Sequence, residues 1–424
     1  MNFAHQNGDR IGQQALASLG LAGLLVGFLV SRTWEIESAP LLIFLYVCSV
    51  SLPMMVGSIW INQTYARETS GIDPRISSFS PSRAVLKLLG LFGTLIVLAF
   101  VYYLIPAYSS AFYKPVWICV KYGIIPFVPL SLFYIAWVDS KMRDPKDDLY
   151  AAGLFFSGQW KGLEWKRFGD HAKAWLVKGF FLPFMLAGTA EHVTLLTSEG
   201  INPSTFPYLY ISIINLIYTI DILYGAVGYL LTLRILDSHI RSVDSTLSGW
   251  AVTLICYPPI SALRNELHLA YTNKGDWQSW LFPHPVIFIT WGFVIILLHI
   301  LYVWSDFSFG CRFSNLTNRG IITTGPYRWF KHPAYLSKNI AWWLMFVPFV
   351  IQSNWKGSVF ACLSLGVTNL IYFFRAKTEE RHLLQDPAYQ VYSRWMAQHG
   401  VAAQAIARAR QMLAIILRIN WIRE

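Results

Sequence analysis

The sequence predicts an all-α protein that crosses a membrane many times. The chain has 424 residues, of which 55% are hydrophobic and only 13% are charged, whereas soluble domains carry about 25% charged residues. Its mean hydropathy is +0.42. The apolar residues gather in runs close to the roughly 20 residues that a helix needs to cross a bilayer. Because a helix satisfies its own backbone hydrogen bonds in lipid, such runs predict a polytopic integral membrane protein built of helices.

The apolar runs predict about ten transmembrane segments. The clear runs are 15–30, 40–61, 85–105, 115–138, 174–196, 206–233 and 283–304. The run 340–374 is interrupted by polar residues at 352–354, so it predicts two short helices in a C-terminal hairpin. The short run 250–263 contains Pro258-Pro259 and is expected to cross as a broken helix.

The links between the runs alternate in charge. Basic links follow the second, fourth and sixth runs, and links poor in Lys and Arg follow the first, third and fifth. Basic links stay in the cytoplasm, so both termini and the loop after 283–304 are expected there, provided that 250–263 crosses. If that run does not cross, the loop changes side. The net charge of +11 then reflects topology rather than nucleic-acid binding, and no lipidation or retention signal ends the chain, which favours a bacterial inner membrane.

The most informative stretch is 318–339, NRGIITTGPYRWFKHPAYLSKN. It is polar, basic and aromatic between two apolar runs, and each of its two prolines pushes the preceding residue out of the α region. It therefore predicts a folded loop at a membrane surface. A second stretch, RAKTEE from Arg375, follows the hairpin, and its Arg375 and Glu379 share one helix face. Because both ends of a hairpin return to one side, this stretch is expected beside His332.

These residues resemble a known superfamily. The order G-P-Y-x-W-F-K-H-P-x-Y, helical hairpin, R-x-x-x-E-E is similar to the catalytic core of membrane methyltransferases that use S-adenosylmethionine. The resemblance is to the isoprenylcysteine carboxyl methyltransferase family, with phospholipid N-methyltransferases as relatives. One departure is Lys331, where many members have Arg. The resemblance implies a methyltransferase-like core in 281–424. The mixture of arginine and apolar residues in 401–421 predicts an amphipathic helix that either lies on the membrane surface or packs on the catalytic loop. Residues 1–280 would form a transmembrane bundle of unassigned role.

The resemblance also assigns a site. The residues implied to hold S-adenosylmethionine are Gly320, Ile321, Ile322, Tyr327, His332, Pro333, Ala334, Tyr335 and Glu379. Arg375 matches the catalytic position that handles the acceptor's carboxylate, a group that a guanidinium binds through two parallel hydrogen bonds. A carboxylate is ionised at neutral pH and needs no general base, so methylation of a carboxylate on a lipophilic or lipid-modified acceptor is favoured. Such an acceptor would reach the site from the membrane lipids.

Two further features bear on ligands. Asp221 is an acid inside the run 206–233 and is a candidate for an acceptor cavity, because an unpaired acid is costly in hydrocarbon. The alternative is a hydrogen bond between helices. The five cysteines are dispersed without a CxxC pair, so no metal site is predicted.

Two other functions remain open. Membrane sterol reductases that use NADPH share a similar C-terminal layout, and their pattern resembles R-H-x-N-Y-x-G-D. Residues 331–338 read KHPAYLSK and lack its Asn and Asp. A transporter or membrane scaffold is the non-enzymatic alternative, but the sequence shows no internal repeat and few charges inside the apolar runs.

Overall fold

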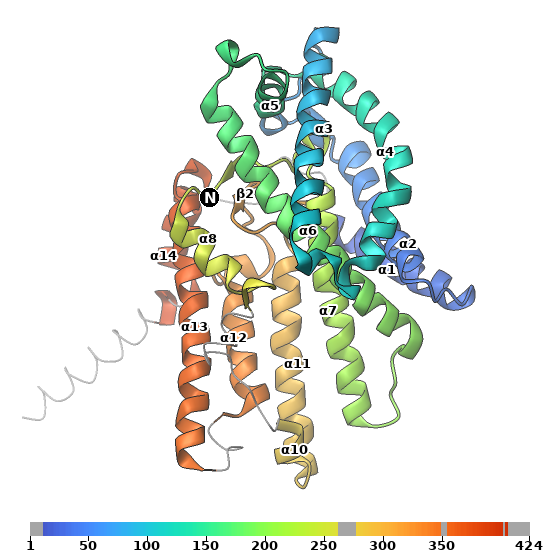
Figure 1. Ribbon diagram of the computed structural model, residues 1–424. Helices are drawn as coiled ribbons and strands as arrows, with labels where there is room; N and C mark the ends of the chain where they lie inside the picture. The colour runs from blue at the N-terminus through green and yellow to red at the C-terminus, as the bar shows by residue number, and fades with distance from the viewer. Residues whose placement is uncertain (1–11, 262–276, 349–353, 402, 406–424) are drawn as a thin grey trace, which may run out of the picture. The chain divides into compact units, whose positions relative to one another are not determined.

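A computed structural model describes residues 12–261, 277–348, 354–401 and 403–405 (Figure 1). The described chain is almost entirely helical and forms two compact units. The N-terminal unit holds the residues up to 263 together with 309–320, and the C-terminal unit holds 264–308 and the residues from 321 onward. The chain therefore leaves the N-terminal unit, returns to it for twelve residues and leaves it again.

The N-terminal unit contains the six long helices that the apolar runs predict. Its helices are α1 (Gln13–Thr33), α2 (Ala39–Val56), α3 (Pro81–Leu104), α4 (Lys114–Lys141), α5 (Asp148–Phe156), α6 (Trp165–Glu199), α7 (Phe206–Leu230) and α8 (Leu247–Leu254). Local signals set their starts: Ser80 accepts the Arg83 N–H at the start of α3, and Asp147 accepts the Tyr150 N–H at the start of α5. Helix α6 begins nine residues before the predicted 174, because its charged first turns continue the helix.

The C-terminal unit contains the predicted hairpin. Its elements are α10 (Trp277–Leu281), α11 (Pro285–Phe307), the 3-10 turn η10 (Gly325–Arg328), α12 (Pro333–Phe346), α13 (Trp355–Leu383) and α14 (Pro387–His399). Helices α11, α12 and α13 run side by side (Figure 1). Proline occupies the first turn of α11, α12 and α14, where its missing N–H costs no hydrogen bond. Helix α12 therefore starts at Pro333 rather than near 340.

Eight helices in the described residues are long and apolar enough to cross a membrane: α1, α2 with its extension to Ile61, α3, α4, α6, α7, α11 and α13. Helix α8 has eight residues, or about 12 Å at 1.5 Å per residue, far less than a hydrocarbon core of about 30 Å. The described part of 250–263 therefore does not cross as a helix. Most of the predicted surface helix at 401–421 lies outside the described residues.

Two short strands join distant loops of the N-terminal unit. Strand β1 (Ser242–Val243) pairs antiparallel with β2 (Thr317–Asn318), and Arg241 and Asp244 extend the ladder with hydrogen bonds to the carbonyls of Asn318 and Leu316. The loop after α7 and residues 309–320, which follow α11, therefore lie on the same side of this unit. Residues 309–320 and the loop after α7 therefore share one side of the membrane, whether or not the run 250–263 crosses it.

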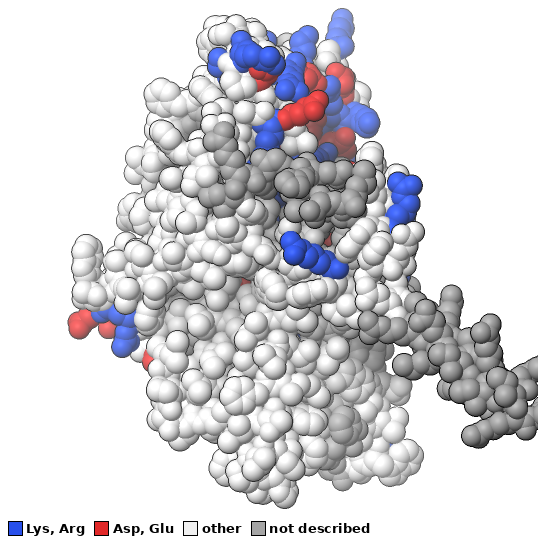
Figure 2. Space-filling view, turned by 180° about the vertical axis from the view of Figure 1, so that it is seen from behind, with Lys and Arg blue, Asp and Glu red and all other residues white. Residues whose placement is uncertain are grey.

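Charged side chains gather at one end of the N-terminal unit. Figure 2 shows Lys and Arg together with Asp and Glu over the region that Figure 1 labels α5. Arg167 of α6 binds Asp144, in the loop between α4 and α5, at 2.9 Å, and Lys173 binds Asp170 within α6 at 2.7 Å. This distribution is typical of a helix bundle whose polar links lie outside the bilayer.

Candidate active site

The start of α12 positions the first two site residues. His332 precedes the helix with extended φ of −131°, and Pro333 occupies its first position. Tyr335 lies in the first turn of α12, so its ring stacks on the His332 imidazole, with 5.5 Å between ring centroids and 2° between planes. Stacking of this kind holds the imidazole in one orientation.

The last turns of α13 bring two carboxylates to these rings. Tyr335 Oη donates to Glu379 Oε2 at 2.9 Å, and His332 Nε2 lies 3.2 Å from Glu380 Oε1. His332 Nδ1 is 3.9 Å from Glu379 Oε2, so both carboxylates face one imidazole. Lys377 Nζ binds the outer oxygen of Glu380 at 3.2 Å. Two carboxylates therefore meet His332 and Lys377 at this point.

Arg375 lies one turn before the carboxylates and is buried, with 6% exposure. Its guanidinium carbon lies 5.2 Å from the Tyr335 ring centroid and 5.7 Å from that of Tyr372. Contacts of a cation with aromatic faces stabilise it. Tyr335 therefore contacts Arg375 through its ring and Glu379 through its hydroxyl, so the three side chains form one connected group.

The loop before α12 is held by α14. Tyr392 Oη donates to the Tyr327 carbonyl at 2.8 Å, and Ile321 packs against a buried group of Tyr389, Tyr392 and Met396. Ile322, Tyr327 and Ala334, three more of the predicted site residues, are buried. Burial raises the pKa of Tyr327 well above its usual value, so this phenol stays neutral at physiological pH.

Two buried hydroxyls in this unit lack a hydrogen-bond partner among the described residues. They are Thr324 Oγ1, beside η10, and Tyr389 Oη on α14. Burial raises the pKa of Tyr389, and the charges of Glu380 and Glu379 raise it further, which indicates that its phenol lies near both carboxylates. The Glu379 side chain is still 38% exposed. The site therefore offers carboxylate acceptors and unused hydroxyls to a ligand that carries a cation and hydroxyl groups, which fits S-adenosylmethionine.

Two predicted site residues lie in the other unit. Gly320 and Asp221 both belong to the N-terminal unit, where Gly320 follows β2 and Asp221 lies on α7. The Gly320 N–H donates to Asn318 Oδ1 at 2.8 Å. The structure thus groups eight of the nine implied cofactor residues and Arg375 in the C-terminal unit.

The motifs assigned no role in the site to Glu380, Tyr389 or Tyr392. Glu380 is part of the R-x-x-x-E-E motif, and in the structure His332 lies between its carboxylate and that of Glu379 and reaches both. The spacing of Tyr389 and Tyr392, three residues apart in a helix that begins at Pro387, was the available signal for the other two.

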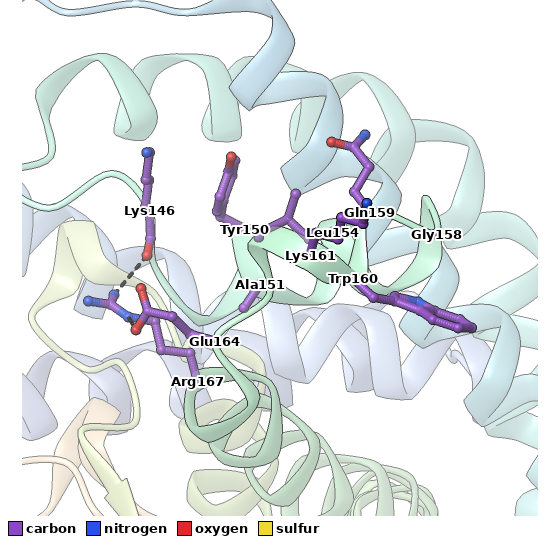
Figure 3. A pocket seen from close by; sticks show the side chains of 11 residues that line it. Lys146, Tyr150, Ala151, Leu154, Gly158, Gln159, Trp160, Lys161, Glu164 and Arg167 are labelled. Carbon is purple, nitrogen blue, oxygen red and sulfur yellow. Dashed lines mark hydrogen bonds and ion pairs between the residues drawn. The ribbon is translucent and has the colours of Figure 1, made fainter.

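A cleft of about 620 Å³ opens elsewhere, at the charged end of the N-terminal unit. Figure 3 shows Arg167 and Glu164 beside Lys146 at one end of it and Trp160 at the other. Arg167 is engaged there by the Lys146 carbonyl at 2.7 Å and by Glu164 at 3.0 Å. None of the predicted site residues lines this cleft. The described residues also include no cluster of three or more His, Cys, Asp or Glu that is suited to a metal ion.

Comparison with known proteins identifies the family of the C-terminal region. Residues 287–385 match the model of the Isoprenylcysteine carboxyl methyltransferase (ICMT) family. The match runs from α11 to the end of α13 and includes the His332, Tyr335, Arg375 and Glu379 group, so the predicted resemblance is confirmed for about a quarter of the chain. Curated proteins and solved structures gave no match. The multi-pass helical architecture together with this family supports a membrane methyltransferase of the ICMT type.

Proposed function

From the family of the C-terminal region, we propose that this protein transfers a methyl group from S-adenosylmethionine to the carboxylate of a lipophilic acceptor. S-adenosylmethionine supplies a methyl group already activated on a cationic sulfonium, so the protein needs only to hold the reactants in line and exclude water. The observation that carries the proposal is the connected group of His332, Tyr335, Arg375 and Glu379 inside the matched region.

Each side chain has a distinct proposed role. Glu379 would accept hydrogen bonds from the cofactor's ammonium or ribose hydroxyls, because its carboxylate is partly exposed and only one hydrogen bond to it is described. His332 and Tyr335 would keep that carboxylate oriented. Ile321, Ile322, Tyr327, Pro333 and Ala334 would shape the walls of the cofactor site, and the backbone at Gly320 would join them. Arg375 would bind the acceptor's carboxylate through its fork.

The acceptor is proposed to be lipophilic because a soluble acceptor would not require an enzyme buried in lipid. Asp221 is proposed as a second contact to the acceptor. The proposed location is a bacterial inner membrane with the site and both termini in the cytoplasm, and the charge pattern of the links supports this orientation.

The first experiment measures cofactor binding by titration of the purified protein in detergent with S-adenosylmethionine. The wild type should bind saturably, and Glu379→Gln should bind about 10- to 100-fold more weakly, because a charged hydrogen bond contributes roughly 1.5–3 kcal/mol. His332→Ala should weaken binding as well. The matched control is Glu68→Gln, whose side chain is 91% exposed. Absence of binding by the folded wild type, with NADPH bound instead, would support a reductase; binding of neither would support a scaffold.

The second experiment asks which acceptor is methylated. The purified protein is given an S-prenylated N-acetylcysteine and, separately, an amine with the same hydrocarbon chain. The proposal expects a base-labile methyl ester on the carboxylate and no N-methyl product. Methylation of the amine alone would overturn the carboxylate assignment while leaving the cofactor site intact.

A further inference from the structure

Loops of the N-terminal unit gather several arginines around one buried carboxylate. The Asp237 side chain is 1% exposed, and it accepts hydrogen bonds from Thr69 Oγ1 at 2.8 Å, Arg241 Nη2 at 3.0 Å and Arg312 Nη2 at 2.8 Å. Arg67 Nη1 approaches the same carboxylate to 3.8 Å. Both carboxylate oxygens are therefore occupied.

Arg319 adds another positive charge, and no described carboxylate binds it. It is 2% exposed, and its guanidinium donates only to backbone carbonyls, those of Gly228, Ser238, Cys311 and Phe313. Burial lowers the pKa of Arg319 to about 9, so its charged form is disfavoured. Arg241, Arg312 and Arg319 thus share one carboxylate among the described residues. Two positive charges remain uncompensated, even without Arg67.

The same unit comes closer to charge balance elsewhere. At the junction of α3, α4 and α5, Asp139 binds Arg83 at 2.7 Å and Lys87 at 3.1 Å, and Asp147 binds Lys87 at 3.3 Å and Arg234 at 3.7 Å. Three cations there face two carboxylates. An unpaired buried charge is costly. The larger excess of positive charge around Asp237 would therefore be stabilised by an anion from outside the chain.

Two free guanidinium nitrogens converge beside Gly320. A Cβ at this position would lie 3.1 Å from Arg312 Nη1 and 3.4 Å from Arg241 Nη1. Neither Nη1 atom has an acceptor among the described residues, because the hydrogen bonds of both arginines go to Asp237 through other atoms. The φ of +111° at Gly320 is open to glycine and strained for other residues. A Cβ at residue 320 would therefore crowd Arg312, and glycine lets the backbone approach both Nη1 atoms closely.

His239 supplies a further polar group without a partner. Its Nδ1 is buried and has no hydrogen-bond partner among the described residues. Burial, together with the positive charges of nearby Arg234, Arg241, Arg319 and Arg312, lowers its pKa to about 2, so this imidazole is neutral at physiological pH. Its position among four arginines indicates that an anion in their midst would also lie near it.

We propose that this arginine cluster, formed by Arg67, Arg241, Arg312 and Arg319 around Asp237 and Gly320, binds a phosphate group. The forks of Arg241 and Arg312 match phosphate oxygens, and a dianion would neutralise the two excess charges. The phosphate belongs either to the headgroup of an anionic lipid or to a free phosphate compound. Gly320 is also among the residues proposed to hold S-adenosylmethionine, so the test of the phosphate site uses no S-adenosylmethionine and can fail separately from the proposed function.

The test measures the melting temperature of the full-length protein in neutral detergent at constant ionic strength. Inorganic phosphate is titrated against chloride, and phosphatidic acid in mixed micelles is titrated against phosphatidylcholine. A saturable rise in melting temperature is expected with phosphate, phosphatidic acid or both. Phosphate alone would identify a soluble ligand, and phosphatidic acid alone would identify a lipid.

Two variants of Arg241 and a matched control test whether the arginine cluster causes the rise in melting temperature. Arg241→Gln should weaken the apparent affinity about 10-fold or more, since a hydrogen bond to a charged group contributes roughly 1.5–3 kcal/mol. Arg241 is suitable because its side chain is 25% exposed, and Arg241→Lys keeps the charge if the first variant does not fold. The control is Arg75→Gln, whose side chain is 88% exposed. No rise with either phosphate source, or equal weakening by Arg75→Gln, overturns the proposal.

Discussion

The two units handle buried charge in different ways. In the N-terminal unit, cations meet carboxylates directly, as Arg83 and Lys87 meet Asp139. In the C-terminal unit, the described contacts of Arg375 are with tyrosine rings, and Glu379 binds a phenol. The Asp139 pair is thus closed and buried, whereas the guanidinium of Arg375 packs on aromatic rings and the carboxylate of Glu379 is partly exposed. Charged side chains are therefore held by ion pairs around Asp139 and by tyrosine side chains around Arg375.

The largest expected effect comes from opening the Asp139 pair. Asp139 is fully buried, so Asp139→Asn leaves Arg83 and Lys87 without their shared carboxylate and should lower the free energy of unfolding by about 3–5 kcal/mol. Chemical denaturation in detergent measures this loss. Asp144→Asn is the control, because the Asp144 side chain is 62% exposed. An equal loss in both variants would contradict the distinction between closed and exposed pairs.

Arg375→Lys should lower the activity of the protein and leave its stability unchanged. The lysine keeps a positive charge near the Tyr335 ring but loses the planar fork, so kcat/KM for a carboxylate acceptor should fall about 10- to 100-fold, which corresponds to roughly 1.4–2.7 kcal/mol. The Kd of S-adenosylmethionine and the melting temperature should stay close to those of the wild type. Arg381→Lys, at an exposed position of α13, is the control. A fall in stability without a fall in kcat/KM would make Arg375 a structural residue.

Tyr392→Phe should have a smaller effect on stability. It removes the hydrogen bond to the buried Tyr327 carbonyl and should cost about 1 kcal/mol of unfolding free energy. Since that bond ties α14 to the loop before α12, hydrogen exchange of residues 321–330 should accelerate. Unchanged exchange there would show that packing alone holds the loop.

The smallest effect concerns pH. Burial and the neighbouring Asp147 raise the pKa of Asp148 to about 6 in the folded protein, compared with about 3.9 in an unfolded chain. The folded state therefore favours the protonated acid, and its contribution to stability is lost as pH rises from about 4 to 6. Asp148→Asn should be more stable than the wild type at pH 7, by less than about 1 kcal/mol because the side chain is partly exposed. The difference should vanish at pH 4, as melting curves at both pH values can test.

Local signals in the sequence predicted much of this structure. Hydropathy found the six long helices of the N-terminal unit, but it placed the start of the hairpin near 340, whereas α12 begins at Pro333. The family motif predicted that Tyr335, Arg375 and Glu379 would meet, because a hairpin returns its ends to one side.

The failures have physical reasons. Hydropathy measures how apolar a stretch is but does not show where a helix ends. The run 250–263 was therefore taken as a crossing, although α8 ends at Leu254, shortly before Pro258. The ladder between β1 and β2 joins two-residue strands far apart in the sequence, and such short strands leave no period-2 pattern. The polar and charged partners of Asp237 come from three separate loops, so no single stretch of the sequence predicts the cluster.

The return of residues 309–320 to the N-terminal unit limits how this protein can be dissected. A fragment cut near 280 would remove β2, Arg312 and Arg319 from the N-terminal unit. Strand β1 would then lose its partner strand, and the carbonyls of Gly228 and Ser238 would lose the hydrogen bonds from Arg319. The complementary fragment would carry the same twelve residues with every N-terminal partner missing. The matched methyltransferase region is therefore not an interchangeable module, and transplanting it into another membrane protein would require either replacing this segment or carrying its host bundle along.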